Sequence, residues 1–517
     1  MASEGMGRRR FLELSGATLI AASAADLVGC ATSKAAASAG PTPGVGYFGS
    51  FGVTEPLLAE VLAAAMSRGA DHADVFYQHR VSSSLGLQDG AVNRSSASVS
   101  LGVGVRAVKG DQQGYGYTED LSLPAILECA RTAAAIADGP ARTEPVRFHV
   151  RSGLPERYPV KVRWEDVRPE QTMPILSRLE AQVLASDSRV KKVNINFGDE
   201  YGAILIADSS GRIVEDVQPM TRLYLQCTAE QNGKRESGGY NVAARAGLEY
   251  YDEDRLARLV REAVGRTTIL FEAVPAPAGE MPVVLAAGSS GILLHEAIGH
   301  GMEADFNRKN VSIFSDKIGK PVAKPFVNIV DDATVQSARG AINVDDEGND
   351  AGRTSLVENG ILTTYLHDSV SARHYGVKPT GNGRRESYQF APIPRMRATY
   401  MLPGPHAREE IVASVKKGIF CSNFTNGQVN IGAGDFTFYV KNGWLIEDGK
   451  LTRPVKDVNV IGNGPKVLER IDMVANDLVI DEGGWTCGKD GQSVPVSQGI
   501  PTVRVSSITV GGQARKG

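Results

Sequence analysis

The chain has 517 residues, with 56 lysines and arginines against 59 aspartates and glutamates and a formal net charge of −3. Beyond residue 30 it has no block of basic residues, which argues against a protein that binds nucleic acid through an electropositive surface. The length predicts two or three domains, and the five widely spaced cysteines form no disulfide framework.

The first thirty residues predict export. Arg8, Arg9 and Arg10 precede a weakly apolar run over 14–25 that is too short to span a bilayer, a pattern typical of a twin-arginine signal. The run ends at Cys30 in a sequence similar to a bacterial lipobox, so residues 1–30 predict a signal that leaves Cys30 lipidated. A plain cleaved signal with an incidental cysteine is the alternative.

We therefore expect twin-arginine export to the periplasmic side of a bacterial envelope, with the lipid on Cys30 as the chain's one attachment to a membrane. The next segment, 31–46, is rich in Ala, Ser, Pro and Gly. Such a composition buries too little apolar surface to fold, so we expect a flexible linker.

Two small α/β units are predicted next, over 47–138 and 155–273. In each, hydrophobic periodicity predicts a helix, then strands, then a second helix, and Asp89-Gly90 marks a hairpin turn. The predicted elements of the first unit are a helix over 55–67, strands over 73–81, 83–88 and 98–109, and a helix over 123–137. Those of the second are a helix over 174–185, strands over 191–196, 203–207 and 221–230, and a helix over 254–267.

A proline- and alanine-rich boundary at 274–279 precedes the third predicted domain, 280–512. Short strands and glycine-rich turns dominate it. The fold class is therefore α+β: two small N-terminal α/β units, followed by a β-rich C-terminal domain that carries the helix described next.

That helix contains the most informative motif, His295-Glu296-Ala297-Ile298-Gly299-His300, directly after a strand-like run over 281–287. Neutral imidazole is a favoured zinc ligand, and a neighbouring glutamate can take a proton from water that the cation has acidified. The spacing is one residue longer than the usual HExxH. On a regular helix, positions five apart lie about 140° apart around the axis, so the two rings would not reach one ion. A single π-type turn restores one face, and Gly299 and Gly301 supply a backbone that allows it. By itself the motif also fits an ordinary amphipathic helix.

Three segments in order resemble the TldD/PmbA family of metallopeptidases, known in older usage as modulators of DNA gyrase. They are HEAIGHGMEADF at 295–306, PTGNGRRESY at 379–388 and CGKDGQSVPV at 487–496. The resemblance extends from about residue 54 to 512. Because both histidines and the glutamate are present, the chain resembles the TldD-like branch and not the partner branch that lacks the zinc motif.

The resemblance implies one zinc ion per chain, held by His295, His300 and Cys487. A thiolate binds zinc tightly, and three protein ligands leave a fourth position open. Asp305 is the competing third ligand and would make a harder site. Otherwise Asp305 and Glu303 would orient the histidines through their second ring nitrogens.

The implied activity is hydrolysis of peptide bonds in extended or unfolded polypeptides, with Glu296 as the general base that activates water. Two arginines of the second segment, Arg384 and Arg385, have two readings. They would bind a substrate carbonyl or terminal carboxylate, or they would pin a loop through salt bridges.

Family members are dimers, so the resemblance implies either a homodimer or a heterodimer with a metal-free relative. Two other functions stand as alternatives. One is a non-catalytic partner or peptide-binding subunit of such a complex, against which the intact His295, Glu296 and His300 argue. The other, a topoisomerase modulator, conflicts with the absence of a basic surface.

Overall fold

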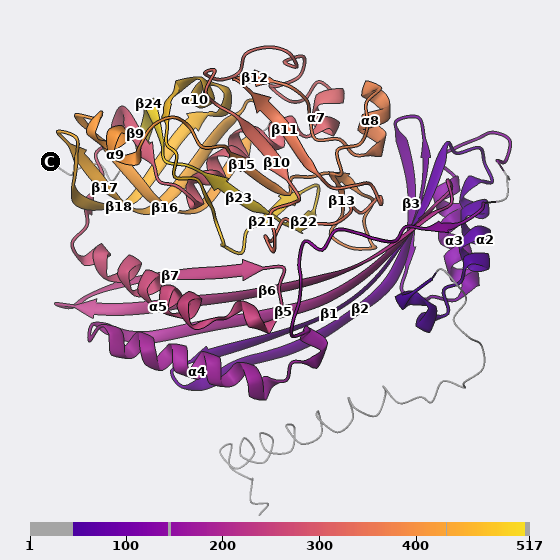
Figure 1. Ribbon diagram of the computed structural model, residues 1–517, viewed down its shortest axis with the longest axis horizontal. Coiled ribbons are helices and arrows are strands. Elements are labelled where there is room, and N and C mark those ends of the chain that lie inside the picture. The colour runs from indigo at the N-terminus through magenta and orange to yellow at the C-terminus, as the bar shows by residue number, and fades with distance from the viewer. Residues whose placement is uncertain (1–44, 143–145, 431, 512–517) are drawn as a thin grey trace, which may run out of the picture. The chain divides into compact units, whose positions relative to one another are not determined.

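Mostly long, antiparallel strands form the N-terminal part of the protein. The computed structural model describes residues 45–142, 146–430 and 432–511, and Figure 1 shows these strands running beneath the C-terminal strands. They make a seven-stranded sheet in the order β3-β2-β1-β5-β6-β4, with β7 paired to β6. The strands are β1 (His72–Gln88), β2 (Ala91–Lys109), β3 (Gln112–Thr118), β4 (His149–Val150), β5 (Val190–Asp208), β6 (Arg212–Gln231) and β7 (Lys234–Ala244).

This one sheet joins the two predicted α/β units, because β1 of the first pairs antiparallel with β5 of the second from Asp74 to Gln88. Because of this pairing, the predicted strands 73–81 and 83–88 are a single strand. Ser82, Ser83 and Ser84 have low strand propensity, but each pairs with both β2 and β5. The predicted hairpin turn is confirmed: Asp89 and Gly90 both have positive φ and join β1 to β2.

Four helices cover one face of the sheet, and their apolar sides share a single core with it. Leu58, Ile126, Leu179 and Leu259, one from each helix, are buried in this core with Val75 of β1. The helices are α2 (Glu55–Met66), α3 (Leu123–Ala134), α4 (Pro169–Ser186) and α5 (Glu253–Thr268). Short 3-10 turns accompany them at η1 (Tyr47–Phe51), η2 (Trp164–Asp166), η3 (Leu248–Tyr250) and η4 (Ile269–Phe271).

The opposite face of the sheet meets the C-terminal region. Phe76, Ile204 and Ile206 form a small buried cluster there with Tyr388. Because side chains alternate along a strand, Phe76 faces away from the helix-covered core in which Val75 lies. The sheet is therefore buried on both faces at this point.

The C-terminal region is built on two larger sheets and two hairpins. One sheet has the order β19-β24-β9-β16-β17-β18-β8, and β18 also pairs with β24, which closes five of its strands into a ring. The other has the order β12-β11-β10-β15-β23-β20. The strands are β8 (Val274–Pro275), β9 (Gly279–Leu285), β10 (Ile329–Asp332), β11 (Arg353–Glu358), β12 (Ile361–Leu362), β13 (Gly383–Arg384), β14 (Ile393–Pro394), β15 (Ala398–Met401), β16 (Lys417–Asn430), β17 (Asp435–Glu447), β18 (Lys450–Asn463), β19 (Ile471–Val474), β20 (Val479–Ile480), β21 (Thr486–Lys489), β22 (Gln492–Pro495), β23 (Ser497–Ile500) and β24 (Val503–Gly511).

The α+β class is confirmed. The β-rich region holds the motif helix between strands of its two larger sheets. Leu294 and Ile298 of that helix are buried in the same core as Val283 of β9 and Ile419 of β16. The helices of this region are α6 (Ile292–Leu294), α7 (Ala304–Arg308), α8 (Ser369–Tyr375), α9 (Arg408–Ala413) and α10 (Gly464–Arg470).

Candidate metal centre

The motif helix contains the π-type turn that its spacing predicts. After the 3-10 turn η5 (Ser289–Gly291) and α6, the backbone forms a π-helical turn, η6 (His295–Gly299), and then a 3-10 turn, η7 (His300–Met302). Gly299 keeps an ordinary helical φ of −58° there. Glycine is therefore needed because a larger side chain would not fit, and not because of its backbone freedom. A Cβ on Gly299 would lie 2.0 Å from Sδ of Met396.

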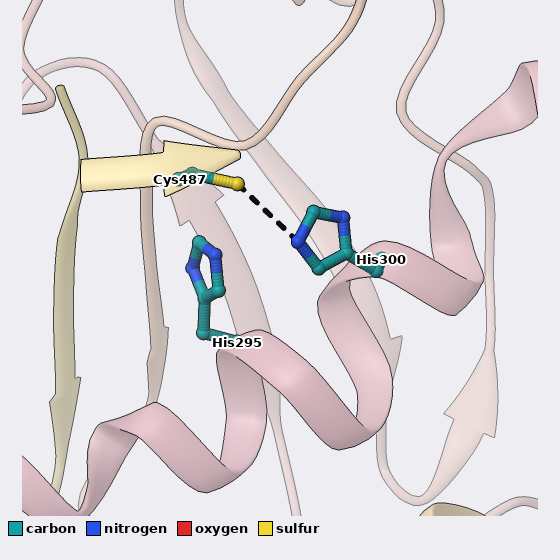
Figure 2. A group of neighbouring side chains, drawn as sticks. All are labelled: His295, His300 and Cys487. Carbon is teal, nitrogen blue, oxygen red and sulfur yellow. Dashed lines mark hydrogen bonds between the residues drawn. The ribbon is translucent and has the colours of Figure 1, made fainter. Parts of the chain in front are cut away.

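The π-turn brings His295 and His300 to the same side, where they meet Cys487 of β21. One ligand atom from each residue lies within 4.8 Å of the other two, and all three residues are buried. Figure 2 shows both imidazoles reaching toward the cysteine, with Cys487 Sγ 3.3 Å from His300 Nε2. Among the described residues this is the group of histidine, cysteine and acidic side chains that would hold a metal ion.

Charge within the group favours a thiolate. Burial by itself raises the pKa of Cys487, but the neighbouring His295 and His300 outweigh burial and hold that pKa well below its ordinary value. Two imidazoles and a thiolate are the donors that zinc and similar ions prefer. The residues present therefore fit the metal that the motif implies.

A buried charge network of Glu303, Asp305 and Lys489 lies behind His300. The His300 Nδ1–H donates to Glu303 Oε2 at 2.9 Å, which leaves Nε2 directed toward Cys487. Lys489 Nζ lies 3.1 Å from Glu303 and 2.8 Å from Asp305. Burial opposes ionisation of Glu303, but Lys489 and then His300 lower its pKa to about 2. Asp305 is thus paired with Lys489, and the structure brings Cys487, not Asp305, to the two histidines.

Glu296 lies in the same π-turn as His295. Burial raises its pKa above the ordinary value, against the opposing effect of the two histidines. Its side chain approaches β16, since a Cβ on Gly427 would lie 3.6 Å from Glu296 Cγ. A carboxylate with a raised pKa beside a metal group is suited to accept and return a proton.

The two predicted substrate arginines lie apart from this group. Arg385 Nη2 is 3.5 Å from Asp74 Oδ1 on β1 and donates to the Asp346 carbonyl at 2.9 Å, which links the two halves of the protein. Arg384 donates to the carbonyls of Met396 at 2.6 Å and Pro495 at 2.8 Å. Arg385 thus fits the prediction that it pins a loop through salt bridges. Arg384 has no carboxylate within 4.0 Å among the described residues.

The remaining described cysteines, Cys129, Cys227 and Cys421, are buried free thiols. Burial raises the pKa of Cys421 to about 12, which keeps it a neutral thiol. These cysteines pack as small apolar residues. Sequence reasoning missed Lys489, for which the only signal was its place two residues after Cys487.

Comparison with known families and relatives agrees with this geometry. Three family models match: PmbA/TldA metallopeptidase domain 1 at residues 73–137, the central domain at 163–271 and the C-terminal domain at 278–512. The chain is 41% identical over 452 residues to the "Metalloprotease TldD homolog" of Haemophilus influenzae, covering 86% of this chain and 94% of that one. It is 34% identical over 236 residues to the "Zinc metalloprotease TldD homolog" of Saccharolobus solfataricus, covering 46% of this chain and 52% of that one.

Solved structures share the fold. A chain from Thermotoga maritima, described as a candidate modulator of a DNA gyrase, matches with a TM-score of 0.72 and 22% identity, over 88% of this chain and all of that one. TldE from Thermococcus kodakarensis matches with a TM-score of 0.67 and 17% identity, over 86% of this chain and 97% of that one.

The comparison contradicts the predicted export. The TldD homologue that this chain matches along 86% of its length is named as a metalloprotease and not as an exported lipoprotein. The twin-arginine signal over 1–30, the lipid anchor on Cys30 and the periplasmic location are therefore wrong. Three arginines before a short, alanine-rich run are a weak pattern, because alanine adds little hydrophobicity. Residues 1–44, with most of the predicted linker, lie outside the described residues.

In the part of the chain that the structure describes, no helix is both long and apolar enough to cross a membrane. The family models together match most of the chain beyond residue 72, and the relatives' names support a metal cofactor. The chain therefore belongs to the PmbA/TldD family of metallopeptidases and is TldD-like.

Proposed function

We propose that this protein is a zinc-dependent peptidase that cleaves extended or unfolded polypeptides. The observation that carries the proposal is the meeting of His295, His300 and Cys487 around a π-turn that also holds Glu296. The name of the Saccharolobus solfataricus relative, a zinc metalloprotease, supports zinc as the metal. One ion per chain is expected, because each chain supplies one such group among its described residues.

His295, His300 and Cys487 would hold the zinc ion, which when bound acidifies water and polarises a peptide carbonyl. Glu303 fixes the ring of His300 by accepting its Nδ1–H. Glu296 takes the proton of the attacking water and returns it to the departing amine. Its raised pKa makes it a stronger base than an exposed glutamate.

The proposed substrate is a chain without folded structure, and the proposed assembly is a dimer, either with itself or with a metal-free relative. The fold likeness to TldE is what supports a relative as partner. A non-catalytic, peptide-binding role is the alternative, and the following experiment separates the two.

The full chain, purified without chelators, is analysed for metal and incubated with a reduced and alkylated polypeptide and with the same polypeptide folded. We expect about one zinc per chain and cleavage of the unfolded form only. Glu296→Gln should keep its zinc but lose at least about 100-fold in rate, the lower end for general acid–base catalysis. Glu469→Gln, an exposed glutamate on the neighbouring α10, is the matched control and should cleave normally.

A chain that binds zinc but does not cleave the unfolded polypeptide would favour the peptide-binding subunit. Full activity in Glu296→Gln would show that another group handles the proton.

A further inference from the structure

A polar cavity lies between the N-terminal sheet and the C-terminal region. Its volume is about 260 Å³, less than a typical site for a drug-sized ligand. Five arginines line it: Arg80, Arg245, Arg339, Arg384 and Arg385. Three carboxylates line it as well: Glu200, Asp346 and Glu386. The lining thus has two more positive than negative groups.

Three of these arginines have no carboxylate within 4.0 Å among the described residues: Arg245, Arg339 and Arg384. Arg245 is buried, its Nε has no hydrogen-bond partner, and its Nη1 reaches only the neutral Gln218 Oε1 at 3.3 Å. Arg339 donates to the Trp485 carbonyl at 2.9 Å and to the Thr486 hydroxyl at 3.3 Å. Since Arg384 also donates only to carbonyls, three guanidinium groups share the cavity without a direct counter-charge.

Each carboxylate of the cavity already has another partner. Glu200 pairs with Arg80 at 3.2 Å. Asp346 accepts from the backbone N–H of Arg385 at 2.7 Å, and Glu386 accepts from that of Ser493 at 2.6 Å.

Burial is costly for charges that lack a partner. It lowers the pKa of Arg384 to about 9, against the opposing effect of Asp346, and that of Arg339 to about 10, and in both cases neighbouring arginines add to the lowering. An anion in the cavity would relieve both the burial cost and the repulsion.

We propose that this cavity is a binding site for a small oxyanion, a carboxylate or a phosphate, held by Arg245, Arg339 and Arg384. Guanidinium groups match the planar geometry of such oxygens and form strong charge-assisted hydrogen bonds with them. The inference does not depend on the proposed peptidase activity.

The site lies behind the hairpin that carries Cys487. Thr486 and Pro495, which face each other across β21 and β22, line the cavity. The next pair, Cys487 and Val494, is buried on the other side, because side chains alternate along each strand. A bound oxyanion would therefore brace the outer face of the strand that supplies the cysteine.

The test is titration calorimetry on the full chain carrying its metal, with three probes. These are inorganic phosphate, acetyl-alanyl-alanine with a free carboxylate, and the same peptide as its amide. Binding of phosphate alone indicates a free anion as the source, and binding of the acid but not the amide indicates a peptide terminus. Binding of both anions supports the shared chemistry.

Arg245→Gln and Arg339→Gln should each weaken binding at least about tenfold, the loss expected for one charge-assisted contact. Arg453→Gln, an exposed arginine on β18, is the control and should bind normally. Arg339 is partly exposed, so its variant keeps the test valid if Arg245→Gln fails to fold. The proposal is overturned if neither anion binds at about 10 mM, or if both arginine variants bind as tightly as the unmodified chain. Heat of binding is measured without turnover, so an inactive enzyme would not affect this result.

Discussion

Lys489→Met should destabilise the protein strongly, because it leaves two buried carboxylates without their cation. The Lys489 side chain is 2% exposed, and its Nζ lies 3.1 Å from Glu303 and 2.8 Å from Asp305. Breaking a buried ion pair by removing one partner costs about 3–5 kcal/mol. Methionine keeps most of the volume, so little of this loss would come from a cavity.

The expected fall in melting temperature follows from the size of the C-terminal domain. For a domain of 150–250 residues, 1 kcal/mol shifts the midpoint by about 2–4 °C, so a loss of 3 kcal/mol corresponds to about 6–12 °C. Thermal unfolding followed by circular dichroism measures this shift. Zinc affinity should fall as well, because Glu303 would hold His300 less firmly.

A second substitution tests the reason for the loss. Adding Asp305→Asn to Lys489→Met removes one of the two stranded charges and should recover part of the stability. Lys450→Met, at an exposed position on β18, is the control and should change the midpoint little. A midpoint within about 2 °C of the unmodified chain in Lys489→Met would refute the reasoning, since it would mean that the carboxylates find other partners.

Two further changes have defined outcomes. Cys487→Ser should lower zinc affinity far more than Cys421→Ser, because a hydroxyl cannot supply the charge of a thiolate; metal titration with a competing chelator measures this, and equal affinities would contradict it. Asp368→Asn should raise the melting temperature more at pH 8 than at pH 5, whereas Asp252→Asn, an exposed helix cap, should show no such difference. Burial and then Glu347 raise the pKa of Asp368 to about 6, so the stability that the protonated acid contributes below about pH 4 is lost as the pH rises through 6. Asparagine keeps the cap to Ser371 without this charge; a gain independent of pH would count against the argument.

The π-turn and the composition of the metal group could be predicted from the sequence, for different reasons. The turn follows from helix geometry, since two histidines five residues apart meet only if the helix is locally widened. Cys487 could not be placed by periodicity, because nothing local relates it to His295. Its prediction depended on the resemblance to a family.

The joining of the two N-terminal units could not be predicted, because pairing between β1 and β5 depends on contacts across a hundred residues and not on local pattern. Buried ion pairs escaped prediction for the same reason. One example is Arg397, the residue before β15. It is fully buried and pairs with Asp331 at 2.7 Å.

The export prediction failed for a different reason. Arginines ahead of a short alanine-rich run are consistent with a signal, but this composition is too common to identify one. Patterns tied to a geometric requirement, such as the histidine spacing, were therefore more reliable than patterns of composition.

The distance along the chain between the proposed metal ligands affects when the proposed metal centre can assemble. Cys487 and His300 are separated by 187 residues, and the cysteine lies on one of the last hairpins to be synthesised. A ribosome-bound chain that has emerged only as far as β18 has both histidines and Glu296 but not the thiolate. The proposed metal centre therefore cannot assemble until synthesis has passed residue 487 of the 517.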